Sequence, residues 1–171
     1  DSIFATDRWK TSNGLVWYHD FDCFELNHID EAEVRIELNG ADMGLTNYGR
    51  MPRLCSASMF FVEKAGDIFQ LIRAEVDRRR IDEEHTIMQV INEDEAYNLK
   101  ERVKLLNITY AFHRFNFHHC YARANKPLKA AHFHLTPDKY DFYVRGNNTL
   151  HLPLIPKNLV EVFHAHGFQY A

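Results

Sequence analysis

A short apolar run followed at once by a segment of helical period constrains this chain more than any other feature. Residues 54–62 are almost entirely apolar, a length and composition that suit a buried strand. In residues 65–80 the apolar side chains, among them Ile68, Ile72 and Val76, recur at helical spacing and share one face. The basic residues 78–80 come last, where the helix dipole favours positive charge. The sequence therefore predicts a strand and then a helix.

A second helix is predicted directly after the first. Asp82 occupies an N-cap position, and Glu83 and Glu84 fall in the first turn, where acidic residues are favoured. Residues 87–91 then supply an apolar face.

The remaining segments are shorter. Residues 31–38 place apolar side chains at alternate positions between charged ones, which is the period of a strand with one solvated face. We predict further strands at 14–19, 103–112 and 128–135, turns at 39–40 and 126–127, a polar loop at 41–50 and a terminal helix at 158–166. Strands and helices interleave and no long linker divides them. We therefore predict one α/β domain over residues 1–171, with a mixed, partly parallel sheet.

Composition and charge exclude several classes of protein. The net charge of -4 gives no general affinity for nucleic acid, and the basic residues 78–80 are explained by the predicted helix end. The longest apolar runs, such as 54–62 and 105–112, are far shorter than the ~20 residues of a membrane span. Three cysteines without CxxC spacing indicate neither a disulfide framework nor a zinc ribbon. A soluble protein of the reducing cytoplasm is expected.

Two acidic residues and two histidines form the most informative pattern. Asp20 and Asp22 come directly after the predicted strand 14–19. His132 and His134 lie in another predicted strand, and His132 follows Asp22 by 110 residues. On a regular strand two such carboxylates stand about 6.6 Å apart, so they converge only where the strand gives way to a loop. Oxygen ligands suit Mg²⁺ or Mn²⁺, and an imidazole favours Mn²⁺. A helix cap with a solvated carboxylate, and core histidines, remain the alternatives.

Several motifs resemble one enzyme family in their order and spacing. Residues 16–22, Val-Trp-Tyr-His-Asp-Phe-Asp, resemble the DxD motif of nucleotide-sugar glycosyltransferases of the GT-A fold. Residues 126–134 are similar to the strand whose histidine completes the metal site in that fold, and residues 54–80 resemble the strand and helix that follow the DxD loop. Residues 82–84 resemble the acidic helix start that faces the acceptor, and residues 106–110 the segment near an asparagine found there. The resemblance spans residues 14–139.

The resemblance implies a GT-A-like mixed sheet and the transfer of a sugar from a nucleoside diphosphate sugar to an acceptor hydroxyl of a carbohydrate or glycan. Mn²⁺ or Mg²⁺ would be held by Asp20, Asp22 and a histidine, His132 or His134, and would neutralise the leaving diphosphate. Asp20 and Lys139 would then contact the donor. A solvated lysine in a turn explains Lys139 equally well.

An inverting transferase of this kind also needs a carboxylate to take the proton of the acceptor hydroxyl. Asp82 and Glu83 are the first candidates, with Asp42 a further one, and a helix cap explains Asp82 equally well. Only 19 residues precede Asp20. The resemblance therefore implies the C-terminal part of a GT-A domain that lacks most of the N-terminal nucleotide-binding half.

Two other classes of function remain open. His132 and His134 with a carboxylate and a distant histidine would suit a two-histidine, one-carboxylate iron site or a cupin, although a cupin would be almost wholly β. The numerous aromatic residues would also suit a carbohydrate-binding module without catalytic activity, or simply a core.

Overall fold

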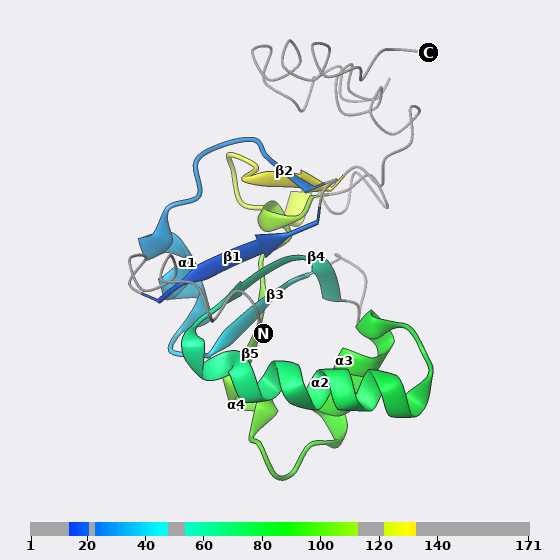
Figure 1. The fold of residues 1–171 in the computed structure, drawn as a ribbon. Helices are drawn as coiled ribbons and strands as arrows, with labels where there is room; N and C mark the ends of the chain where they lie inside the picture. Colours follow the sequence, from blue (N-terminus) through cyan, green and yellow to red (C-terminus); the bar gives the residue numbers. More distant parts are fainter. Residues whose placement is uncertain (1–13, 21–22, 48–53, 113–121, 133–171) are drawn as a thin grey trace, which may run out of the picture.

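The computed structural model describes residues 14–20, 23–47, 54–112 and 122–132 of the chain (Figure 1). The strands are β1 (Val16–His19), β2 (Cys23–Glu25), β3 (Met43–Asn47), β4 (Leu54–Phe61), β5 (Val103–Leu106) and β6 (Ala130–His132). The helices are α1 (Glu31–Leu38), α2 (Gly66–Arg79), α3 (Glu83–Glu93) and α4 (Leu99–Arg102), with short 3₁₀ turns η2 (Glu63–Ala65) and η3 (Ile108–Tyr110).

Four strands form a mixed sheet in the order β1-β4-β3-β5. The pairs β1–β4 and β3–β4 are antiparallel, whereas β3 and β5 are parallel. Strands β2 and β6 form a separate antiparallel ribbon, which lies above this sheet in Figure 1. The predicted α/β class, with a mixed sheet flanked by helices, is confirmed.

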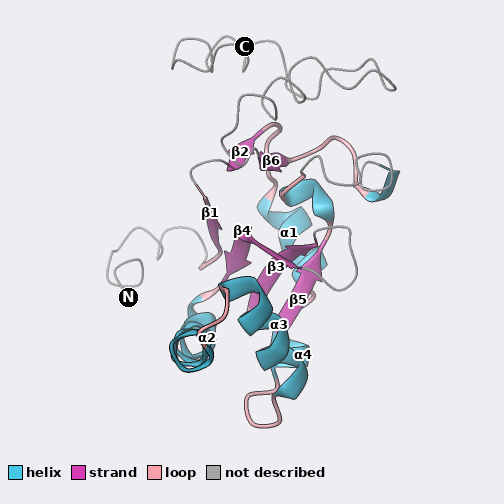
Figure 2. Ribbon diagram, turned by 90° about the vertical axis from the view of Figure 1, so that its right-hand side faces the viewer, coloured by secondary structure: helices cyan, strands magenta, loops and turns pink. Residues whose placement is uncertain are grey.

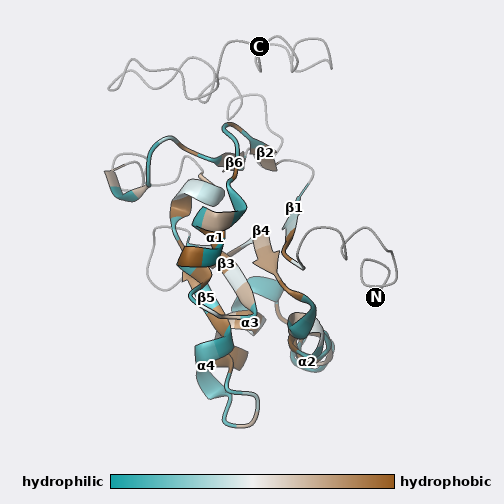
Figure 3. Ribbon diagram, turned by 90° about the vertical axis from the view of Figure 1, so that its left-hand side faces the viewer, coloured by the Kyte–Doolittle hydropathy of each residue, from teal (hydrophilic) through white to brown (hydrophobic). Residues whose placement is uncertain are grey.

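Helices cover both faces of the sheet, so the molecule has three layers (Figure 2). On β4 the neighbouring residues Phe60 and Phe61 point to opposite faces. Phe61 packs with Ile68 of α2 and Ile87 of α3 in the larger core, and Phe60 packs with Val34 of α1 in the smaller one. The strand β4 is drawn in hydrophobic colours in Figure 3, whereas the helices also carry hydrophilic stretches. This strand is the centre of the core.

The two predicted helices at 65–80 and after Asp82 are confirmed as α2 and α3. Helix α2 ends at Arg79. The next residue, Arg80, is its C-cap and adopts the left-handed conformation with φ 59°. Asp82 is the N-cap of α3, and its side chain accepts a hydrogen bond from the backbone N–H of His85. Within the described ranges, no helix is both long and apolar enough to cross a membrane.

The strand predicted at 31–38 is wrong, because this segment forms helix α1. The side chain of Asp30 caps the helix, and Val34 and Leu38, four residues apart, are buried on one side. Ile36, which a strand would place beside them, is 78% exposed. Alternation of charged and apolar residues therefore hid a helix that buries a narrow apolar stripe.

The loop predicted at 41–50 is also wrong over Met43–Asn47, which forms the buried strand β3 between β4 and β5. The polar composition of the segment has a structural use. The hydroxyl of Thr46 donates a hydrogen bond to the carbonyl of Ser58, at 2.9 Å. Gly44 leaves room above the strand for Leu38 and Leu106, which the Cβ of any other residue would meet.

The other predicted strands are confirmed in part. Strand β1 forms within residues 14–19, but it lies at the edge of the sheet and is only half-buried. The segment 103–112 divides into β5 and η3, and the described part of the segment 128–135, which ends at His132, contains β6. The terminal helix predicted at 158–166 lies outside the described residues.

Candidate functional site at the end of strand β1

Asp20 lies where β1 ends and the chain turns away from the sheet. Its backbone N–H donates to the carbonyl of Ala57 on β4, at 3.0 Å. Its own carbonyl accepts from the N–H of Cys23, also at 3.0 Å. The expected change from strand to loop at this residue is therefore present.

Tyr18 is the third residue of β1, and Asp20 directly follows the last residue of that strand. The hydroxyl of Tyr18 donates a hydrogen bond to Oδ1 of Asp20, at 3.2 Å. Burial, and then the charge of Asp20, raises the pKa of Tyr18 above its ordinary value. The hydroxyl therefore keeps its proton at neutral pH and serves as a donor to the carboxylate.

Glu83, the first residue of α3, lies within the electrostatic reach of Asp20. Glu83 is exposed as a whole residue, but partial burial of its carboxyl group raises its pKa. The negative charge of Asp20 raises this pKa further. The helix N-terminus acts in the opposite direction. The structure thus brings together a predicted metal ligand and a predicted base from distant parts of the sequence.

The neighbouring residue Glu84 attaches the start of α3 to the sheet. Its Oε1 atom accepts a hydrogen bond from the backbone N–H of Ser56 on β4, at 3.1 Å. Ser56 is adjacent to Ala57, which pairs with Asp20. This bond explains why Glu83 is held near the end of β1.

Both carboxylate oxygens of Asp82 contact His85 in the first turn of α3. Oδ1 accepts from the backbone N–H of His85 at 3.0 Å, and Oδ2 lies 2.6 Å from Nδ1 of the same residue. The hydrogen bond from the backbone of His85 is the main reason why the pKa of Asp82 is lowered. The interpretation of Asp82 as a helix cap is confirmed, and its catalytic role stays a prediction.

Asp42 lies beside the C-terminal end of β4, whereas Asp20 bonds to Ala57 in the middle of that strand. The carbonyl of Asp42 accepts from the N–H of Val62, just beyond the last residue of β4. Its Oδ2 atom is 2.7 Å from Nε of Arg102, which also pairs with Asp67. The structure therefore places Asp42 in an ion-pair network and not beside Asp20.

His132, the last residue of β6, is 5% exposed. Its Nδ1 atom lies 3.8 Å from Sγ of Cys55, which is also buried, and its backbone N–H donates to the carbonyl of Phe112. Cys55 is two residues from Ala57 along β4, and Cys23 pairs with His132 between β2 and β6. His132 thus borders the region in which β1 ends.

The predicted residues Asp22, His134 and Lys139 lie outside the described residues. Over the part of the chain that the structure describes, no group of three or more His, Cys, Asp or Glu side chains is arranged to hold a metal ion. The described part of the predicted ligand set is Asp20 and His132. A metal at this position stays a prediction.

Two hydrogen bonds of this region were not predicted from the sequence. The bond from Tyr18 to Asp20 had a partial signal, since the two residues are only two positions apart in the sequence. The bond from Ser56 to Glu84 had none, because it joins a backbone group to a side chain of another element.

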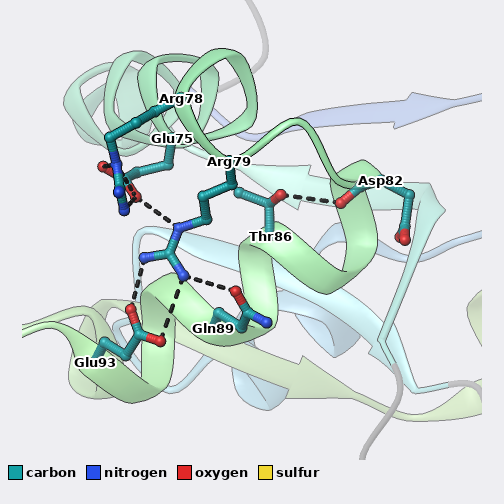
Figure 4. A network of polar contacts seen from close by, with 7 residues as sticks. All are labelled: Glu75, Arg78, Arg79, Asp82, Thr86, Gln89 and Glu93. Atoms are coloured by element: carbon teal, nitrogen blue, oxygen red, sulfur yellow. Dashed lines mark hydrogen bonds and ion pairs between the residues drawn. The ribbon is translucent and has the colours of Figure 1, made fainter.

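A hollow of about 210 Å³ lies between α2 and α3. Apolar side chains of both helices line it, and charged residues form its rim. Figure 4 shows the rim network, in which Arg79 contacts Glu75, Gln89 and Glu93. These side chains neutralise one another, so the network ties the helices together.

Comparison with known proteins gives no match. No family model matches the sequence, and neither the curated proteins nor the solved structures are significantly similar to this chain. The functional argument therefore rests on the residues and their geometry.

Proposed function

We propose that this chain is a metal-dependent glycosyltransferase, which moves a sugar from a nucleoside diphosphate sugar to an acceptor hydroxyl of a carbohydrate or glycan. The observation that carries the proposal is that Asp20 and the start of α3 are bonded to adjacent residues of β4: Asp20 to Ala57, and Glu84, the neighbour of Glu83, to Ser56. Transfer of this kind needs a carboxylate on the donor side and a second carboxylate as base. The order of motifs along the chain supports the same assignment.

Glu83 is the proposed general base of an inverting transfer. A raised pKa brings a carboxyl group closer to neutral pH, where it takes up a proton more readily. The acceptor oxygen forms a bond to the anomeric carbon while the bond from that carbon to the diphosphate oxygen breaks. The acceptor proton passes to Glu83, and the diphosphate leaves with the electron pair. Asp82 is the weaker candidate, since both of its oxygens are engaged by His85.

Asp20 is the proposed centre of the donor side. Its oxygens are the kind of ligand that Mn²⁺ and Mg²⁺ prefer, and the imidazole of His132 lies on the adjoining ribbon. Asp22 and His134 are proposed as further ligands, and Lys139 as a contact of the donor. When bound, such a cation supplies positive charge that stabilises the leaving diphosphate. The role of Asp20 is to orient that charge towards the site that Glu83 borders.

A donor screen tests the proposal directly. The full chain is heated with UDP-, GDP- or TDP-sugars in the presence of Mn²⁺, and the melting temperature is recorded. We expect one donor to stabilise the protein and to release nucleoside diphosphate slowly even without an acceptor. The absence of both effects for every donor would overturn the proposal.

Two matched pairs of variants test the assigned roles. Asp20→Asn should abolish the stabilisation by donor and Mn²⁺, whereas Asp77→Asn, an exposed aspartate of α2, should retain it. Glu83→Gln should retain donor binding but lower the transfer rate by about 100-fold or more, whereas Glu95→Gln should leave the rate unchanged. Equal effects within either pair would refute the assigned role.

One observation favours a second candidate, a carbohydrate-binding module. Tyr18 is 39% exposed, and its hydroxyl bonds to the carboxylate of Asp20. Sugars bind to such combinations of aromatic and polar groups. Binding of a glycan without any release of nucleoside diphosphate would favour this candidate. No observation favours a cupin, since the sheet is mixed and flanked by helices.

The cytoplasm is the proposed compartment. An odd number of cysteines without paired spacing suits reducing conditions.

A further inference from the structure

The hydrogen bond between Tyr18 and Asp20 joins two side chains at the solvent-facing end of an edge strand. The hydroxyl of Tyr18 lies 3.2 Å from Oδ1 of Asp20. An exposed hydrogen bond of this kind contributes little to folding, because water competes for both groups. Its effect on the carboxylate is larger than its effect on the fold.

The bond fixes one oxygen of a carboxylate that would otherwise rotate. Once Oδ1 accepts from Tyr18, the Asp20 side chain is held at two points, by its own backbone, which is bonded to Ala57, and by the hydroxyl. The oxygen Oδ2 and the remaining lone pair of Oδ1 are left for a ligand. A ligand then binds without the loss of side-chain entropy that orienting the group would cost.

We infer that Tyr18 is a positioning residue of the proposed transferase, whose hydroxyl group holds the Asp20 carboxylate in the orientation that receives the divalent cation. This inference rests on the proposed function and names a residue that the DxD resemblance does not include. Tyr18 acts only through Asp20 and does not contact the reacting atoms.

The test uses the full chain and Mn²⁺ alone as the probe. Tyr18→Phe removes one oxygen and keeps the ring, and Tyr97→Phe, at another exposed tyrosine, is the matched control. Partners of metal ligands typically change metal affinity by about 10- to 100-fold when they are removed. We expect Mn²⁺ to bind Tyr18→Phe about tenfold more weakly, with wild-type affinity in Tyr97→Phe and little change of melting temperature in either.

A kinetic readout separates positioning from a structural role. In Tyr18→Phe the Mn²⁺ concentration for half-maximal release of nucleoside diphosphate should rise about tenfold. The rate at saturating Mn²⁺ should stay close to that of the wild type, because the reacting groups are intact. A fall of the saturated rate with unchanged Mn²⁺ dependence would overturn the inference.

A double-mutant cycle shows whether the effect passes through Asp20. In the Asp20→Asn background the further change Tyr18→Phe should have no effect on Mn²⁺ affinity. An equal loss in both backgrounds would overturn the inference, and so would wild-type affinity in Tyr18→Phe alone. If the unmodified chain binds neither Mn²⁺ nor any donor, the proposed function itself fails, and this outcome is distinct from a failure of Tyr18 alone.

Discussion

The Nη2 atom of Arg79 lies 2.6 Å from Oε2 of Glu93, and this ion pair joins helix α2 to helix α3 (Figure 4). The same guanidinium donates to Glu75 of its own helix and to Gln89 of α3. The side chain of Arg79 is only 15% exposed. Arg79 therefore helps to hold α3, the helix whose first turn carries Glu83, against α2.

Replacing Arg79 should loosen the two helices. We expect Arg79→Met to lower the melting temperature by about 2–4 °C, because the ion pairs with Glu75 and Glu93 and the hydrogen bond to Gln89 are lost together. Arg78→Met is the matched control, since Arg78 is more exposed and forms its ion pair with Glu75, within its own helix. A larger loss in Arg78→Met, measured by thermal unfolding, would contradict the assigned role.

Acid should weaken the same network. Hydrogen bonds from Arg78, and then from Arg79, lower the pKa of Glu75 from 4.5 to about 2. A carboxylate whose folded pKa is lowered stabilises the fold above its unfolded pKa, and this contribution is lost as the pH falls from about 4.5 towards 2. The melting temperature of Glu75→Gln should therefore lie below that of the wild type at pH 7, and the gap should narrow below pH 4.5. A gap that stays constant would refute the role of the ionised form.

Two glycines provide a matched test of packing. A Cβ at Gly44 would stand 2.6 Å from Cδ1 of Leu106 and 2.8 Å from Cδ2 of Leu38, whereas a Cβ at Gly66 would meet nothing within 4 Å. We expect Gly44→Ala to cost about 1–3 kcal/mol of stability, since both leucines are buried and must shift. Gly66→Ala, at the start of α2, should be neutral or stabilising by up to about 1 kcal/mol. Denaturant unfolding measures both, and equal effects would contradict the close packing.

Asp82 offers a way to separate capping from catalysis. Asn is as good an N-cap as Asp. The melting temperature of Asp82→Asn should therefore stay close to that of the wild type, whereas that of Asp82→Ala should be lower. If Glu83 is the base, transfer by Asp82→Asn should stay within a few-fold of the wild-type rate. A loss of about 100-fold in a variant that remains folded would instead assign the base to Asp82.

The parts of the fold with strong local patterns could be predicted from the sequence. Helix α2 repeats its apolar residues over several turns, and α3 begins at a good cap, Asp82. Strand β4 is a nearly continuous apolar run, because it is covered on both faces. In each case the local preference and the tertiary environment agree.

The segments that were predicted wrongly depend on distant contacts or on caps. Helix α1 has a strand-like alternation, and its true signals are Asp30 before it and Asn39 after it, the latter left-handed with φ 49°. Strand β3 looks polar, because Gly44 and Thr46 serve neighbours that come from α1, β4 and β5. Leu106 and Ser58 are too distant in the sequence for a short window around β3 to contain them.

The candidate site shows the same division. The end of strand β1 at Asp20 and the helix start at Glu83 were found from local patterns, but their proximity comes from the pairing of β1 with β4 and the bond of Glu84 to Ser56. His132 was predicted on a strand, whereas its burial against Cys55 depends on the β2–β6 ribbon. The sequence indicates which chemical groups are present, and the tertiary pairing decides which of them meet.

The place of β1 in the strand order has a consequence for local opening. Among the described strands β1 has one neighbour, whereas β3 and β4 each have two. Amide protons of β1 should therefore exchange with solvent sooner than those of β4, through fluctuations that leave the rest of the sheet closed. Asp20 directly follows this edge strand, so a ligand held between Asp20 and α3 would slow the exchange of the β1 amide protons.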